Sequence, residues 1–291
     1  MYAVSVNTEK AIAAMGLDVR TIEGVPESFS SEVSRLTLAG GEQVYLKIPY
    51  SKVKWEREAE ALRVLQDQVP VPQLLDVWQG DTEVTGALLL SAIEGEALSG
   101  EVTAETAADI GRCHAELHTV GSERASKALP DLYDNWEEFR DRQFYGFAED
   151  VKGVIPDELF DWSLKHYERL KRQLPPADGP AFIHMDLRPA NIIVKDGRVN
   201  GLIDFESSRF GSTEMDFTKL DRDIFSKHFG TRAAFEAGYR SVRPLPDLDA
   251  ILPFYRFTDA FNSIGWCKRR GIQKNQRFFD ESLEMLAKIF E

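Results

Sequence analysis

The first third of the chain alternates apolar and polar positions in a way that predicts a small β-sheet interrupted by one helix. Residues 31–38 and 43–48 alternate and are joined across Gly40-Gly41, so a hairpin is expected there. From 52 to 68 the apolar residues recur at the spacing of one helix face. The Val-Pro-Val-Pro stretch at 69–72 ends this helix, because a residue that precedes proline disfavours helical geometry. Two more strands are expected, near 74–79 and 87–93.

Helical spacing dominates the rest of the chain, after a short linker at 95–100. A β insert at 181–205 interrupts the helices. The chain is therefore expected to have an α+β fold, with a small antiparallel sheet and one helix in residues 1–93 and a larger, mainly helical part in 94–291. The helices expected in the second part cover 103–120, 136–149, 157–173, 216–229, 252–270 and 278–290.

Composition excludes several classes of protein. The 291 residues carry 48 acidic and 35 basic side chains, which gives a net charge of −13. Neither nucleic acid nor an anionic membrane surface is expected as a partner, because both attract basic proteins. No apolar stretch approaches the ~18 residues of a membrane span, and the N-terminus lacks the pattern of a signal peptide. Cys113 and Cys267 are too few for a disulfide framework, so a cytoplasmic protein with two reduced, buried thiols is expected.

The segment from Phe182 to Glu206, FIHMDLRPANIIVKDGRVNGLIDFE, carries the most chemical information. Its apolar runs at 192–194 and 199–203 flank an Asp-Gly pair, which predicts a hairpin. Antiparallel pairing brings Asn191 and Asp204, at the two open ends, close together. Oxygen side chains of this kind suit Mg²⁺, which usually keeps some water and substrate phosphate oxygens as further ligands. Asp186 lies on the incoming loop and suits a base or a substrate-orienting group.

Two motifs in this segment resemble those of a known family. His184–Asn191 resembles the catalytic loop of the protein-kinase-like superfamily, and Ile203–Glu206 resembles its metal-binding motif. The closest match is the aminoglycoside phosphotransferase group of small-molecule kinases, which includes choline-kinase-like and macrolide-kinase-like enzymes. Upstream, Val44–Lys47 resembles the strand with the nucleotide-binding lysine, and Trp55–Pro72 the helix with its partner glutamate. Together with a match at 211–216, the resemblance covers about Val25 to Leu220 and implies a bilobal protein-kinase-like fold.

The resemblance also implies a role for each matching residue. Lys47, held by Glu58, would contact the phosphates of ATP or GTP as the co-substrate, and the backbone of Ser91–Ile93 would receive the base. Asp186 would orient or deprotonate the acceptor hydroxyl, with Arg188 near the γ-phosphate. Asn191 and Asp204 would bind Mg²⁺, and Asp216 would brace the catalytic loop. Ser30 and Ser31 would offer hydroxyl and N–H groups to phosphate, from a segment at 24–32 that lacks a G-x-G-x-x-G pattern.

One of these pairings is also expected on physical grounds. Glu58 falls on the apolar face of its helix, three residues after Trp55 and four before Leu62. A carboxylate buried there is costly unless it is paired with a cation. Lys47 is the natural partner.

The sequence departs from the family pattern at two positions and leaves the acceptor open. Met185 stands where the small-molecule kinases usually have glycine, and Arg188 replaces a common histidine. The acidic balance favours a cationic acceptor: an aminoglycoside, another amino sugar or a choline-like amine. An acidic cluster at 131–141 is expected to be a solvated face, with attraction of a cationic acceptor as the alternative. Macrolides, sugars and homoserine-like alcohols stay open, as does a role in resistance or in metabolism. Residues on the last helices are expected to shape the acceptor site: Asp259, Asn262, Trp266 and Glu291.

Two alternatives belong to other classes of function. A kinase-fold module that binds nucleotide without turnover would usually have lost part of the catalytic set, which is complete here. A protein kinase would need a longer segment between Asp204 and Asp216 to dock a peptide. His114 and His118 stand four residues apart as in zinc sites, but Ala115 replaces the glutamate of a zinc protease motif, so a packed or surface helix is expected there.

Overall fold

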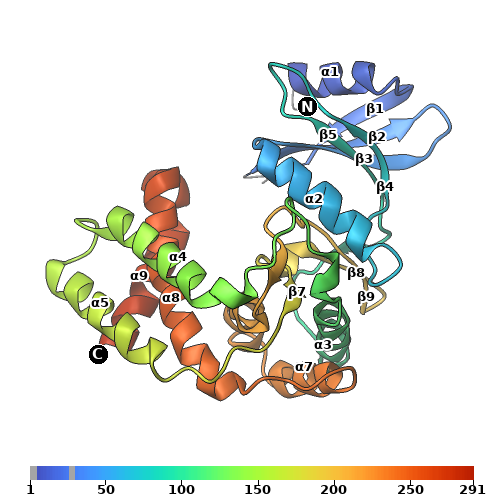
Figure 1. Ribbon diagram of the computed structural model, residues 1–291. Helices are drawn as coiled ribbons and strands as arrows, with labels where there is room; N and C mark the ends of the chain where they lie inside the picture. Colours follow the sequence, from blue (N-terminus) through green and yellow to red (C-terminus); the bar gives the residue numbers. More distant parts are fainter. Residues whose placement is uncertain (1–4, 26–29) are drawn as a thin grey trace.

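The computed structural model describes residues 5–25 and 30–291 and shows two lobes (Figure 1). The N-terminal lobe is a five-stranded antiparallel sheet in the order β1-β2-β3-β5-β4. Lys47 stands in the middle strand, opposite Val33 on one side and Leu88 on the other, so the sheet holds it rigidly. The elements of this lobe are α1 (Val6–Ala14), β1 (Val19–Gly24), β2 (Ser31–Leu38), β3 (Gln43–Pro49), α2 (Lys52–Leu65), β4 (Leu74–Trp78) and β5 (Ala87–Ser91).

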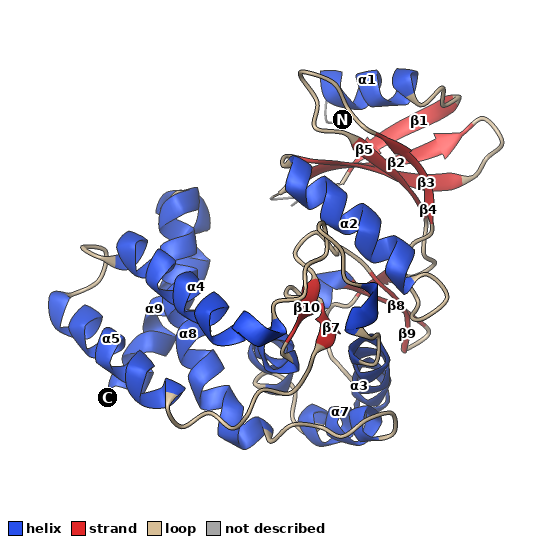
Figure 2. Cartoon of the chain, viewed as in Figure 1, coloured by secondary structure: helices blue, strands red, loops and turns tan. Residues whose placement is uncertain are grey.

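The C-terminal lobe is mainly helical, with short strands near the junction of the lobes (Figure 2). Its α-helices are α3 (Ala104–His118), α4 (Trp136–Val151), α5 (Asp157–Lys171), α6 (Phe217–Leu220), α7 (Thr231–Arg240), α8 (Leu248–Arg270) and α9 (Gln276–Phe290). Its strands are β6 (Glu96–Ala97), β7 (Ala181–Ile183), β8 (Ile192–Lys195), β9 (Arg198–Leu202) and β10 (Arg209–Gly211). Short 3₁₀ turns cover Ser122–Arg124, Tyr133–Asn135, Pro189–Asn191, Thr213–Asp216 and Ile272–Asn275, and a π-helical turn covers Asp221–Phe225.

A continuous apolar core joins the two lobes. It runs from the inner face of α2 through the catalytic hairpin into the helices of the C-terminal lobe. A smaller core lies on the other side of the sheet, under α1. The closest helix contact requires glycine: a Cβ on Gly111 of α3 would lie 2.1 Å from the Phe235 carbonyl oxygen of α7, and one on Gly238 would lie 1.9 Å from that of Ala108. This packing gives the catalytic hairpin a rigid support.

The structure confirms the strands at 31–38 and 43–48, the long helices and the Asp-Gly hairpin, with boundaries shifted by a few residues. It also contains helices and strands that the sequence pattern did not predict. The first is a second N-terminal helix, α1, which buries only Thr8 and Ala11 and so has no apolar stripe. The expected linker contains β6, which pairs with β8, and the helix expected at 216–229 is broken by the π-helical turn. The other additions are β1, β10 and α7. No helix in residues 5–25 and 30–291 is long and apolar enough to cross a membrane.

Candidate active site

A cleft of about 1410 Å³ lies between the lobes and is lined by residues of both. The sequence-predicted site residues that line it are Ser30, Ser31, Lys47, Glu58, Ser91, Ile93, Asp186, Arg188, Asn191 and Asp204. Part of the expected phosphate-contacting segment, residues 26–29, lies outside the described residues. The fold thus brings together groups that are up to 174 residues apart in the chain, from Ser30 to Asp204.

Lys47 is the centre of a buried charge cluster. Its Nζ lies 2.6 Å from Glu58 Oε2, 2.6 Å from Asp204 Oδ1 and 3.7 Å from Glu206 Oε2. The expected Lys47–Glu58 pair is therefore confirmed. Burial alone would lower the pKa of Lys47, but the surrounding carboxylates raise it above its usual value. Burial raises the pKa of Glu58 to about 7, against the opposing effect of Lys47.

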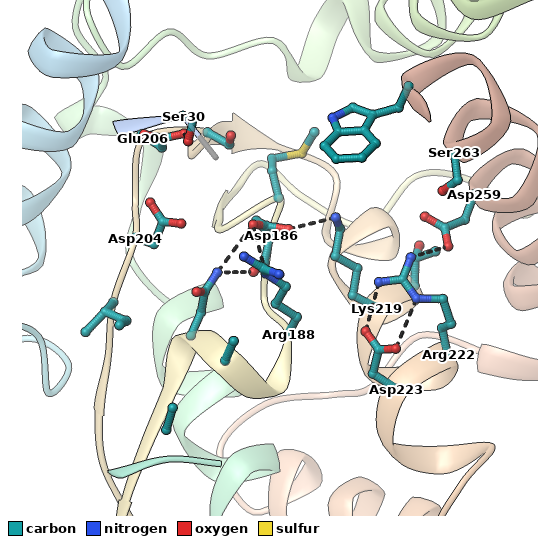
Figure 3. A pocket seen from close by; sticks show the side chains of 18 of the residues that line it. Ser30, Asp186, Arg188, Asp204, Glu206, Lys219, Arg222, Asp223, Asp259 and Ser263 are labelled. Atoms are coloured by element: carbon teal, nitrogen blue, oxygen red, sulfur yellow. Dashed lines mark hydrogen bonds and ion pairs between the residues drawn. The ribbon is translucent and has the colours of Figure 1, made fainter. Parts of the chain in front are cut away.

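Glu206 belongs to this cluster, although the sequence analysis assigned it no role. It accepts hydrogen bonds from Lys54 Nζ at 2.7 Å and from the Ser30 hydroxyl, which stands beside it in Figure 3. Its side chain is buried, and it links the sheet and α2 to the loop that follows Asp204. Its place directly after the apolar Phe205 was the one local signal, since a charged residue needs a partner when it is buried.

The catalytic loop presents Asp186 to the cleft with three partners (Figure 3). Asn191 Nδ2 donates to the Asp186 carbonyl at 2.8 Å and to its Oδ2 at 3.3 Å. Arg188 Nε lies 3.4 Å from Oδ2, and Lys219 Nζ lies 2.7 Å from Oδ1. Lys219 comes from α6, and nothing in the sequence connects it with the loop. These contacts hold the carboxylate at the surface of the cleft and surround it with positive charge.

Asp216 braces this loop, as expected. Its carboxylate accepts hydrogen bonds of 2.6 Å from the backbone N–H groups of His184 and of Met185. Burial would raise its pKa, but the neighbouring His114 and His118 hold the pKa of Asp216 below its usual range. Met185 has a φ of +69°, which explains why glycine is common at this position of the resembling family.

The histidines of the site are structural. His184 Nε2 lies 3.0 Å from the Ile203 carbonyl, and its Nδ1 accepts from the Asp186 N–H at 3.2 Å. His114 and His118 are buried on α3, where burial lowers the pKa of His118 to about 3. His118 Nδ1 lies 2.8 Å from the hydroxyl of Tyr239. Of the packed or surface helix expected at these two histidines, the structure shows the packed one.

The two ends of the cleft differ in character. At the end near Ser91, the N–H of that residue donates to the Gln73 carbonyl at 2.9 Å, and its hydroxyl accepts from the Gln73 N–H at 2.9 Å. The other end is walled by α8 and α9, and Asp259, Asn262 and Trp266 line it as expected. Glu291 is not among the lining residues, because the part of α9 that reaches the cleft ends at Lys288.

The comparison that decides the family is with a model of the phosphotransferase enzyme family, which matches residues 21–254. This chain belongs to the phosphotransferase enzyme family. The resemblance to aminoglycoside phosphotransferases is thus confirmed, and so is the expectation of a phosphotransferase that acts on hydroxyl groups.

The sequence of this phosphotransferase is also similar to those of two curated enzymes. It is 28% identical over 184 residues to an aminoglycoside 3'-phosphotransferase of Enterococcus faecalis, a match that covers 57% of this chain and 66% of the relative. A second such enzyme, of Staphylococcus aureus, is 27% identical over 188 residues, covering 59% of this chain and 68% of the relative. The matched segment thus spans about two thirds of the length of each relative.

Among solved structures, the fold matches a GDP complex of aminoglycoside 2'-phosphotransferase-IIIa with a TM-score of 0.74, at 17% identity and over 97% of this chain and 96% of that one. It also matches a macrolide 2'-phosphotransferase of Brachybacterium faecium with a TM-score of 0.71, at 16% identity and over 95% and 96% of the two chains. The bilobal fold expected from the sequence is confirmed by these matches.

Proposed function

We propose that this phosphotransferase moves the γ-phosphate of ATP or GTP to a hydroxyl group of a small molecule, with Mg²⁺. The observation that carries the proposal is the buried Lys47–Glu58 pair, which faces Asp204 across the same cleft that holds Asp186 and Asn191. Each group needed to position a triphosphate and an alcohol is present and faces one space. A module that only binds nucleotide would not need Asp186 in that space.

The residues around Asp204 suit a hard cation. Glu58, Asp204 and Glu206 bring carboxylate oxygens within 4.8 Å of one another, with Lys47 and Lys54 as the cations in contact with them. The negative charge of the three carboxylates is larger than the positive charge of the two lysines. The donor atoms are oxygens, which Mg²⁺ prefers as ligands. Asp204 and Asn191 would hold the metal, since both line the cleft. When bound, Mg²⁺ would neutralise charge on the phosphates.

The other residues position the reactants. Lys47 would hold the inner phosphates, and the hydroxyls of Ser30 and Ser31 would lie beside them. Asp186 would accept a hydrogen bond from the acceptor hydroxyl and take its proton as the new bond forms. Lys219 and Arg188, both next to Asp186, would offset the charge of the γ-phosphate. Such catalysis rests on positioning and on electrostatic stabilisation.

The acceptor belongs to the open part of the proposal. Structural relatives are known in complex with kanamycin, gentamicin and spectinomycin, and others are named for macrolides. Aminoglycosides and macrolides are therefore the first acceptors to test. A cationic acceptor would meet competition in the cleft, because Arg222 already lies 2.7 Å from Asp259 and 2.8 Å from Asp223. We also propose that the lobes divide at residues 93 and 94. The cytoplasmic location remains a prediction from the sequence.

The experiment is a nucleotide-turnover assay with ATP or GTP, Mg²⁺ and a panel of aminoglycosides, macrolides, amino alcohols and sugars. Asp186→Asn keeps the shape of the side chain but removes the base, so turnover should fall by about 10²–10⁴-fold while nucleotide affinity changes little. Asp196→Asn, in the hairpin turn and outside the cleft lining, is the matched control. Phosphorylation that survives Asp186→Asn would refute the assigned role. Tight nucleotide binding without turnover of any acceptor would favour the non-catalytic module.

A further inference from the structure

Two arginines that the proposed reaction does not use are held by the loop after Asp204, and one of them, Arg209, also lines the cleft. Arg57 lies on α2, next to Glu58, and Arg209 opens β10, after the loop that carries Glu206. Arg57 Nη1 donates to the carbonyl oxygen of Glu206 at 3.3 Å. Arg209 donates to the next carbonyl oxygen, that of Ser207, through Nε at 3.3 Å and Nη2 at 3.0 Å. Consecutive carbonyl groups of one loop therefore anchor the two guanidinium groups.

Neither guanidinium forms a salt bridge with a carboxylate in the described part of the chain, although Glu206 acts on Arg57 and Asp216 on Arg209 from a longer distance. Within residues 5–25 and 30–291, no Asp or Glu oxygen lies within 4.0 Å of Arg57 or Arg209, although most other arginines of the C-terminal lobe have such a partner. The nearest candidate, Glu206, directs its carboxylate to Lys54 and Lys47 instead. The Nε of Arg57 is buried and has no hydrogen-bond partner in the described part of the chain.

The surroundings of the two arginines make their positive charges unfavourable for stability when no anion is bound. Burial and, to a smaller extent, the charge of Arg57 lower the pKa of Arg209 to about 10, against the opposing effect of Asp216, so the two arginines repel each other and Arg209 stays protonated near neutral pH. Burial also lowers the pKa of Arg57. The guanidinium of Arg209 lies 4.7 Å from the ring centre of Phe139, which fixes one of its faces. Buried cations without a partner destabilise a fold unless an anion joins them.

We propose that Arg57 and Arg209 bind a phosphate group in addition to the phosphates of the nucleotide. Guanidinium groups offer forked N–H donors that match the oxygens of phosphate, and both arginines keep donors that no described residue uses. The phosphate group comes from inorganic phosphate or from a small phosphate ester. Because Arg57 adjoins Glu58 and Arg209 follows Glu206, a bound phosphate ties α2 to the loop after Asp204 and so supports the Lys47 cluster.

The test measures thermal unfolding and calorimetric binding with the site for the nucleotide filled by Mg²⁺ and a non-hydrolysable ATP analogue, so that added phosphate cannot take the place of the γ-phosphate. Inorganic phosphate and glycerol 3-phosphate, each up to about 10 mM, are compared with acetate at matched ionic strength, which removes the general salt effect. We expect a saturable rise in melting temperature with phosphate that acetate does not give. The difference between the two phosphate arms shows whether the free ion or the ester fits better.

Variants separate a phosphate site from a merely structural pair. Arg57→Gln should weaken phosphate binding at least about tenfold, since one charge-assisted contact is worth more than 1.4 kcal/mol. Without phosphate it should be no less stable than the parent, because the repulsion is gone. Arg209→Gln is the second variant, and Arg63→Gln, exposed on the same helix, is the matched control. A phosphate response equal to that of acetate, or one that persists in both variants, would overturn the proposal.

Discussion

The two partners of the Lys47–Glu58 pair should differ sharply in what their removal does to stability. Glu58→Gln removes an attraction to Lys47 over 2.6 Å, worth about 6 kcal/mol at an effective dielectric constant of about 20. It also removes repulsions from Asp204 and Glu206, whose oxygens lie within 4.8 Å, each worth about 3 kcal/mol or more by the same relation. These effects nearly cancel. We therefore expect the free energy of unfolding at pH 8, where Glu58 is ionised, to change by no more than about 1 kcal/mol.

Lys47→Met has no such compensation. It removes the attraction to three carboxylates at once and leaves their mutual repulsion in a buried space. Loss of one partner from a buried ion pair typically costs about 3–5 kcal/mol, and we expect at least that cost at pH 8. Both variants should lose activity. In Glu58→Gln, Lys47 would still pair with Asp204, a proposed metal ligand, but would no longer be held by Glu58. Nucleotide KM should therefore rise about tenfold in Glu58→Gln.

The assay is urea unfolding of both variants at pH 8 and at pH 5, beside nucleotide-turnover kinetics. Burial raises the pKa of Glu58 from 4.5 to about 7, so the folded protein binds a proton more tightly than the unfolded chain. This contribution to stability is present below pH 4.5 and is lost as the pH rises to about 7, and Glu58→Gln should remove it. A cost above about 3 kcal/mol for Glu58→Gln, or below about 1 kcal/mol for Lys47→Met, would contradict the reasoning.

Three further predictions concern the brace of the catalytic loop. Asp216→Asn should destabilise the protein by about 2–3 kcal/mol, because one charge-assisted hydrogen bond is lost. Hydrogen exchange at the backbone amides of His184 and Met185 should become faster. Unchanged exchange at both amides would count against the bracing role of Asp216. Burial lowers the pKa of His118 to about 3, so its stabilising contribution is present above pH 6.5 and is lost as the pH falls through about 3. His118→Gln should flatten the fall of stability between pH 6 and 4 by up to about 1.4 kcal/mol per pH unit, and an identical pH profile in urea unfolding would refute this. Met185→Gly should be about 1 kcal/mol more stable than Met185→Ala, because glycine adopts a φ of +69° without strain. At most positions alanine is the more stable of the two residues. Equal melting temperatures of the two variants would contradict this prediction.

The sequence by itself determined the parts of the protein that depend on local pattern. Alternation and helical spacing predicted the hairpin at β2–β3 and the long helices, because one face of each must meet the core. The catalytic segment was also readable, since Asp186, Asn191 and Asp204 lie within one loop and one hairpin. The inward position of Glu58 predicted its pairing with Lys47, because a buried carboxylate needs a cation.

Only the tertiary structure decided which distant groups share a space. Lys219 reaches Asp186 from a short helix, and Glu206 receives Lys54 from the other lobe, and neither approach leaves a trace in local spacing. Likewise, one loop anchors both Arg57 and Arg209, because α2 docks on the loop after Asp204. Electrostatic contacts of this kind depend on distance through space and on burial, which packing sets. The sequence therefore predicted which chemical groups form the cleft, whereas the tertiary structure determined which charged residues contact those groups.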